Sequence, residues 1–150
     1  MLVQKFGGSS LADIEGFSAA AGIISKAAED EKVVVVLSAM YGVTDLLENA
    51  ISTAISGEDY QVVLEAIKDK EFGILQKMET SGFDCPQASG FLQQQLQNLE
   101  SRLAGVSLLG ECPPKVQAEL LSTGEGFSSR LMCDLLKATG HAARWSDTIV

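Results

Sequence analysis

The feature that most constrains the fold is a pair of short apolar segments separated by a glycine loop and a helical segment. Residues 1–6, MLVQKF, are typical of a strand, and a glycine pair breaks this strand before a helical segment over residues 11–30. Residues 33–37, VVVVL, are apolar at every position, which predicts a strand buried on both faces, as in a parallel sheet. The order strand, loop, helix, strand therefore predicts a βαβ unit.

The rest of the chain is mostly helical in pattern. Helical segments are predicted over residues 44–55, 60–81, 90–105 and 115–140. Glycines and prolines, such as those in GECPP at residues 110–114, mark the interruptions between them. Residues 141–150, HAARWSDTIV, are typical of a further strand. We interpret residues 1–150 as one α/β domain that is incomplete, because such a domain normally continues after a strand of this kind.

Composition excludes several classes of function. Twenty acidic residues against 11 basic ones give a net charge of −9, which argues against a surface that binds nucleic acid or anionic lipid. The three cysteines lie far apart in sequence and form no CxxC pair, so neither a disulfide framework nor a zinc site is indicated. No apolar stretch approaches the length of a membrane span, and we expect a cytoplasmic protein.

The glycine loop after the first strand has the residue types of a phosphate-binding site. Gly7 and Gly8 would let backbone N–H groups approach an anion, with the N-terminus of the following helix beside it. Lys5 could follow a phosphoryl group during transfer, while the Ser9 hydroxyl donates to its oxygens. The spacing equally fits a plain tight turn in which Ser9 or Ser10 caps the helix, and on spacing alone both readings stay open.

Two further segments carry polar groups that could meet this loop. The loop after the second strand places Ser38 and Thr44 at the carboxyl edge of the sheet, where open α/β sheets bind their ligands. Glu125 lies between two glycines in a helical stretch, and such glycines indicate a close backbone approach. Ser122 and Glu125 also have the spacing of a capping box, and spacing alone favours that structural reading.

Three motifs, in this order and spacing, resemble the aspartate kinase family. They are KFGGSSLAD at residues 5–13, VVVVLSAMYGVTDLL at residues 33–47 and ELLSTGEGFSSRLM at residues 119–132. The stretch GVSLLGECPPKVQAELLSTGE, residues 105–125, is similar in particular to the kinase part of bifunctional aspartokinase/homoserine dehydrogenases. The resemblance extends over essentially all 150 residues.

The resemblance implies an enzyme that transfers the ATP γ-phosphoryl group to the β-carboxylate of L-aspartate, the first step of lysine, threonine and methionine biosynthesis. The implied fold is that of the amino acid kinases, a mostly parallel sheet between helices, of which this chain carries the N-terminal portion with a helical insert. By motif position, Lys5 would stabilise the transferring phosphoryl group. The other implied site residues are Gly7, Gly8 and Ser9 around the phosphates, and Ser38, Thr44 and Glu125 in the aspartate site.

The family context adds further expectations. Glu125 would pair with the α-ammonium of aspartate, which reverses the preference for a cap. Magnesium would arrive with ATP, since the sequence indicates no protein metal site and no tightly bound cofactor. The expected partners are the C-terminal half of the kinase domain, regulatory ACT domains, a possible homoserine dehydrogenase domain and further copies in a homo-oligomer.

Some residues depart from the family pattern, and two other functions stay open. The family commonly has threonine at Ser10 and smaller residues at Met40 and Tyr41. The arginine-serine-aspartate segment and the adenine loops of the family are absent from these 150 residues, so we expect the chain to be inactive alone. The alternatives are a kinase for a different substrate, such as glutamate or acetylglutamate, and a non-catalytic regulatory module.

Overall fold

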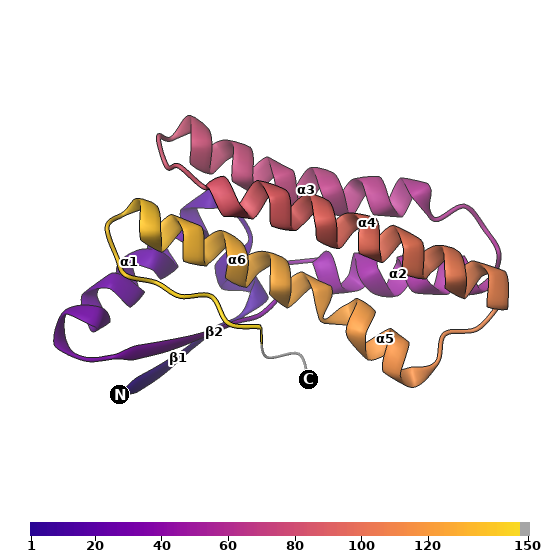
Figure 1. The fold of residues 1–150 in the computed structure, drawn as a ribbon, viewed down its shortest axis with the longest axis horizontal. Helices are drawn as coiled ribbons and strands as arrows, with labels where there is room; N and C mark the ends of the chain where they lie inside the picture. Colours follow the sequence, from indigo (N-terminus) through magenta and orange to yellow (C-terminus); the bar gives the residue numbers. More distant parts are fainter. Residues whose placement is uncertain (148–150) are drawn as a thin grey trace.

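The N-terminal residues form the predicted βαβ unit. In the computed structural model, which describes residues 1–147, β1 (Leu2–Phe6) and β2 (Val33–Leu37) pair in parallel, with Leu2 opposite Val33 and Phe6 opposite Leu37. The crossover between them consists of the 3-10 turn η1 (Gly8–Leu11) and the helix α1 (Ile14–Asp30). The two strands lie together along one side of the helices (Figure 1). The predicted α/β class is confirmed.

The start of α1 differs from the sequence prediction. Asp13, and neither Ser9 nor Ser10, caps the helix, because its side-chain oxygen accepts a hydrogen bond from the Gly16 N–H at 2.8 Å. The two serines lie instead within η1, where the Ser10 N–H donates to the Gly7 carbonyl at 3.0 Å. The sequence Gly-Ser-Ser-Leu forms a tight turn first, and the helix begins only after it.

The remaining helices form an elongated layer next to this unit (Figure 1). Their bounds are Val43–Ile55 for α2, Gln61–Thr80 for α3, Pro86–Leu109 for α4, Pro114–Leu121 for α5 and Thr123–Ala138 for α6. The helices α2, α3 and α4 pack on one another, and α6 lies between α4 and the strand β2. Each helix contributes buried apolar residues to one core. The predicted helical segment over residues 115–140 is thus two helices with a break at Ser122.

The two faces of the sheet have different surroundings. Phe6 and Val35 pack against the core on the face that α1 and α6 cover. On the other face Val3, Val34 and Val36 are 60%, 46% and 45% exposed. The prediction that the second strand is buried on both faces is therefore wrong for the described residues, because α1 and α6 pack on the same side of it.

The segment after α6 is not a strand over residues 141–147. Gly140, with φ of 91°, ends the helix as its position predicted. The backbone beyond it makes local hydrogen bonds, such as that from the His141 N–H to the Leu136 carbonyl at 2.9 Å. Trp145 packs back on α6, and its indole N–H donates to the Ser129 hydroxyl at 2.9 Å. The last residues of the predicted strand, 148–150, lie outside the described residues.

Candidate active site

The first part of the candidate site is the turn at the carboxyl end of β1. Lys5 pairs in register with Val36 and stands on the exposed face of the sheet, since side chains alternate along a strand and its neighbour Phe6 faces the core. Gly7 and Ser9 follow it and are exposed, with Ser9 inside η1. A side chain at Gly7 would meet no atom of the described structure within 4 Å. This turn therefore presents its backbone to open space.

The loop after β2 packs directly against this turn. A Cβ atom at Gly8 would lie 2.9 Å from the Ala39 carbonyl oxygen, so only glycine fits here without a shift of the backbone. The Ser38 N–H donates to the Phe6 carbonyl at 3.0 Å and continues the pairing of the strands. Gly42, with φ of 81°, turns the chain into α2, whose first turn carries the exposed Thr44. The structure thus brings the first and second motifs together.

The third motif reaches the same loop through the first turn of α6. A Cβ atom at Gly124 would lie 2.6 Å from the Ala39 Cβ and 3.1 Å from a Val43 methyl carbon. The close approach expected at these glycines is therefore present at Gly124. At Gly126 it is absent, because a Cβ there would make an ordinary 3.8 Å contact with Phe91. Glu125, between the two glycines, is exposed.

The capping-box interpretation of Ser122 and Glu125 is wrong. Ser122 has helical backbone angles, and its hydroxyl donates to the Glu119 carbonyl at 2.8 Å in the preceding helix. A capping serine would instead have extended backbone angles and accept a hydrogen bond from an N–H group of α6. Glu125 is therefore free of the structural role that spacing alone favoured.

Ser128 contacts the loop after β2, although it is not among the candidate site residues predicted from the sequence. Its buried hydroxyl lies 2.6 Å from the Ser38 carbonyl oxygen and 3.2 Å from the Glu125 carbonyl oxygen. The sequence shows that Ser128 shares a helical face with Glu125, three residues earlier. It gives no sign of the partner Ser38, which lies 90 residues away.

The three motifs therefore converge on residues 38–43. Gly8 packs on this loop from η1, and Gly124 and Ser128 pack on it from α6. The predicted site residues near it are Lys5 on β1, the hydroxyl-bearing Ser9, Ser38 and Thr44, and the exposed Glu125. Two charged residues that the motifs did not single out also lie there: the Lys70 side chain is next to Gly42, and Asp45 follows Thr44 in the first turn of α2. Such a set can bind an anion at one end and an ammonium group at the other.

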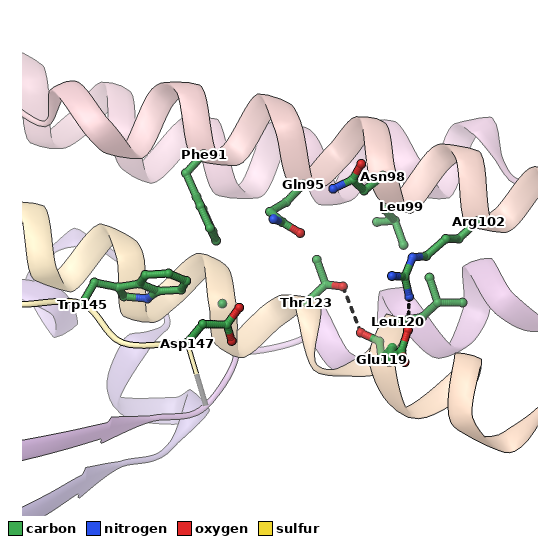
Figure 2. A pocket seen from close by; sticks show the side chains of 11 residues that line it. Phe91, Gln95, Asn98, Leu99, Arg102, Glu119, Leu120, Thr123, Trp145 and Asp147 are labelled. Carbon is green, nitrogen blue, oxygen red and sulfur yellow. Dashed lines mark hydrogen bonds and ion pairs between the residues drawn. The ribbon is translucent and has the colours of Figure 1, made fainter. Parts of the chain in front are cut away.

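A separate hollow lies on another side of α6, between it, α4 and α5. It has a volume of about 300 Å³, and in Figure 2 the side chains of Phe91, Gln95 and Asn98 point into it from α4. Arg102 and Glu119 form an ion pair at its far end. The full lining is Phe91, Gln95, Asn98, Leu99, Arg102, Glu119, Leu120, Thr123, Gly126, Trp145 and Asp147. None of the predicted site residues belongs to this lining.

Other reactive groups are removed from the site. Burial raises the pKa of the Cys133 thiol, and that of Cys85 to about 11, so these side chains stay protonated near neutral pH. Over residues 1–147, no group of three or more His, Cys, Asp or Glu side chains is placed to hold a metal ion. Within the same range no helix is long and apolar enough to cross a membrane.

Known proteins that resemble this chain carry the same fold. A family model described as the amino acid kinase family matches residues 1–149. The crystal structure of Escherichia coli aspartokinase III in complex with aspartate and ADP superposes with a TM-score of 0.82 at 28% identity, over 97% of this chain and 31% of that one. The match to the family model includes all three motifs.

Relatives with and without a second enzyme match over the same stretch. Chloroplastic aspartokinase 3 of Arabidopsis thaliana is 33% identical over 97% of this chain and 25% of its own length. The bifunctional aspartokinase/homoserine dehydrogenase of Buchnera aphidicola is 27% identical over 94% of this chain and 18% of its own length. This chain thus spans a quarter or less of the length of both relatives.

Proposed function

Because this chain belongs to the amino acid kinase family, we propose that it forms part of an aspartate kinase. The observation that carries the proposal is the convergence of the three motifs on residues 38–43, on a fold similar to that of an aspartokinase crystallised with aspartate and ADP. The proposed reaction is attack of a β-carboxylate oxygen of L-aspartate on the γ-phosphorus of ATP. The bond from this phosphorus to the bridging oxygen breaks, ADP leaves, and an acyl phosphate forms.

The turn after β1 is proposed to bind the phosphates. The backbone of this turn is accessible at Gly7, which faces open space. It is held in place at Gly8, which packs against the loop at residues 38–43. Backbone N–H groups of η1 and the Ser9 hydroxyl would donate to phosphate oxygens. Lys5 would stabilise the charge that develops on the phosphoryl group during transfer. Magnesium would enter with ATP, bound mainly by phosphate oxygens and water.

The loop at residues 38–43 and the first turn of α6 are proposed to bind aspartate. The hydroxyl groups of Ser38 and Thr44 would donate to its carboxylates, and Glu125 would pair with its α-ammonium group. Glu125 suits this role because it is exposed and has no capping function. A cytoplasmic location and a homo-oligomer are further parts of this proposal.

The first test is substrate choice by the natural gene product. Purified protein is given ATP, magnesium and one of L-aspartate, L-glutamate or N-acetyl-L-glutamate, and the acyl phosphate is trapped with hydroxylamine. We expect kcat/KM for aspartate to exceed that for the other acids by a factor on the order of 10². Preference for either glutamate compound would assign a different kinase, and no turnover with any acid would favour a non-catalytic module.

Two substitutions test the assigned roles. Lys5→Ala should lower kcat by a factor on the order of 10² or more, with a smaller effect on the KM for aspartate. Lys32→Ala is the matched control, because Lys32 is an exposed lysine that precedes the N-terminal end of β2, at the end of the sheet away from the candidate site. Near-normal turnover of the Lys5 variant would remove this lysine from the mechanism.

Glu125→Gln keeps the shape of the side chain and removes its charge. The KM for aspartate should rise by about tenfold or more, while the KM for ATP changes little, because only aspartate carries the ammonium group. The exposed Glu29 near the end of α1 provides the matched control, as Glu29→Gln. An equal rise in both KM values would mean that Glu125 does not distinguish the two substrates.

A further inference from the structure

We propose that Ser128 is a positioning residue for aspartate, and this inference rests on the proposed function. Its hydroxyl joins the backbone of Ser38 to the first turn of α6, which carries Glu125. These two residues are the ones assigned to opposite parts of the substrate. Ser128 would therefore fix the distance and angle between them without touching aspartate itself.

The hydrogen bond has the geometry of a strong, protected contact. Ser128 is fully buried, and its hydroxyl oxygen lies 2.6 Å from the Ser38 carbonyl oxygen. A hydroxyl group has one proton, so the nearer Ser38 carbonyl is the principal acceptor and the Glu125 carbonyl, at 3.2 Å, a secondary one. Water cannot easily replace the donor at a buried site, so its loss leaves a carbonyl unpaired.

The same peptide segment is held from the opposite direction. The Ser38 N–H donates to the Phe6 carbonyl at 3.0 Å, and Phe6 directly follows Lys5 in β1. Ser38 is thus held by its N–H to the strand that carries the proposed phosphoryl-stabilising lysine, and by its C=O to the helix that carries Glu125. Removal of the Ser128 hydroxyl removes one of these two hydrogen bonds.

The contact at Gly124 does not replace this hydrogen bond. Gly124 lies against Ala39 and Val43 through carbon atoms, so it limits how closely α6 can approach the loop. Apolar packing is non-directional, whereas a hydrogen bond to the Ser38 carbonyl also fixes the rotation of that peptide plane. The orientation of the Ser38 residue therefore depends on Ser128.

The chain provides a matched control in the next residue. Ser129 also lies in α6, but its hydroxyl donates to the Gly126 carbonyl at 3.1 Å and accepts from the Trp145 indole at 2.9 Å. It faces the segment after α6 and not the loop at residues 38–43. Ser129→Ala removes the same chemical group from the same helix and leaves the proposed connection intact.

The test compares Ser128→Ala, Ser128→Cys and Ser129→Ala in the natural gene product. Both Ser128 variants should raise the KM for aspartate by about tenfold and leave the KM for ATP within about twofold, because a small displacement of substrate-binding groups is enough to weaken binding. Ser128→Cys leaves no cavity and replaces the hydroxyl with a thiol, a much weaker donor, and so separates loss of the strong hydrogen bond from the effect of a cavity. Ser128→Thr, which retains a hydroxyl, should restore most of the affinity.

Amide hydrogen exchange of residues 38–43 gives a second measurement that needs no catalysis. Exchange in this loop should be faster in Ser128→Ala and Ser128→Cys and unchanged in Ser129→Ala. Unchanged aspartate KM in active Ser128→Ala and Ser128→Cys variants would overturn the proposal, and so would equal effects of Ser128→Ala and Ser129→Ala. If the wild-type protein does not use aspartate, the proposed function fails, and unchanged exchange would then show separately that Ser128 does not fix the loop.

Discussion

At the scale of single residues, Glu71 is a carboxyl group in the middle of the apolar stripe of α3. It is 0% exposed, and neither of its side-chain oxygens has a hydrogen-bond partner among residues 1–147. Burial raises the pKa of this carboxyl group from its ordinary value of 4.5 to about 8, and the charge of Lys70 only partly opposes this. Glu71 is therefore neutral in the folded protein at pH 7 and ionised in the unfolded chain.

The stability of the protein should consequently fall as pH rises from about 4.5 to about 8. In this range the folded state holds one proton more than the unfolded state, so Glu71 lowers the free energy of unfolding by up to about 1.4 kcal/mol per pH unit. Below this range both states are protonated, and above it both are ionised. Urea denaturation at several pH values between these limits measures the slope.

The variant Glu71→Gln isolates this contribution. Its free energy of unfolding should depend less on pH than that of the wild type, and the variant should be the more stable of the two near pH 8. Glu65→Gln, an exposed position on the same helix, is the control and should leave the slope unchanged. Parallel curves for Glu71→Gln and the wild type would contradict the assignment of the slope to Glu71.

Part of the site could be predicted from residue types, because a position where two backbone segments come close requires glycine. The close approach expected at the glycines beside Glu125 is present at Gly124 and absent at Gly126. A Cβ atom at Gly8 would also be too close to a neighbouring segment, but the expected approach of an anion to Gly7 and Gly8 stays a prediction. The roles of Lys5 and Glu125 stay predictions. Ser128 could not be identified, because its importance comes from an acceptor 90 residues away, and one serine in a helix has many ordinary explanations.

At the scale of secondary-structure elements, the beginning of α4 depends on a side chain from α6. The buried carboxylate of Asp134 accepts hydrogen bonds from the N–H groups of Gln87 and Ala88, at 3.0 and 2.8 Å. The residue at the cap position, Cys85, makes no side-chain capping bond. Asp134 thus serves as the cap of another helix and also lies 3.6 Å from the Arg130 guanidinium.

Loss of this carboxylate should be costly. Asp134→Ala should lower the free energy of unfolding by about 2–4 kcal/mol, because two buried N–H groups lose their acceptor and the largely buried Arg130 guanidinium loses the opposite charge beside it. Asp134→Asn keeps one acceptor oxygen and should cost less. The control Asp84→Ala, in the exposed loop before α4, should change stability by no more than about 0.5 kcal/mol. A larger loss for Asp84→Ala in chemical denaturation would show that α4 has a local cap.

Elements with strong local patterns could be predicted, whereas those that depend on distant partners could not. The strands β1 and β2 and the helices α2 and α3 lie close to where the short apolar segments, the helical patterns and the glycine breaks placed them. The cap of α1 was misassigned because three neighbouring residues, Ser9, Ser10 and Asp13, have suitable side chains. The segment 141–147 was predicted as part of a strand, but only Trp145 among its residues favours strands, and its backbone hydrogen bonds are local.

At the scale of the whole molecule, the sheet is packed on one side only within the described residues. Lys5 stands on the exposed face, beside the partly exposed Val34 and Val36. A lysine surrounded by water stabilises a phosphoryl transition state weakly, because solvent screens its charge. Strong catalysis by Lys5 therefore requires that further polypeptide cover this face and exclude water.

The 150-residue chain assayed alone should accordingly have no measurable aspartate kinase activity, although its loops are already in contact. Phosphoryl transfer depends on the alignment of two substrates and on charge stabilisation in a water-excluded cleft, and an open sheet face supplies neither. The exposed valines should also make the isolated chain self-associate, which light scattering over a concentration series would detect. The assay compares purified chain and natural gene product with ATP, magnesium and aspartate. If the isolated chain turns over within about tenfold of the rate of the natural protein, catalysis does not require further polypeptide over the exposed face of the sheet.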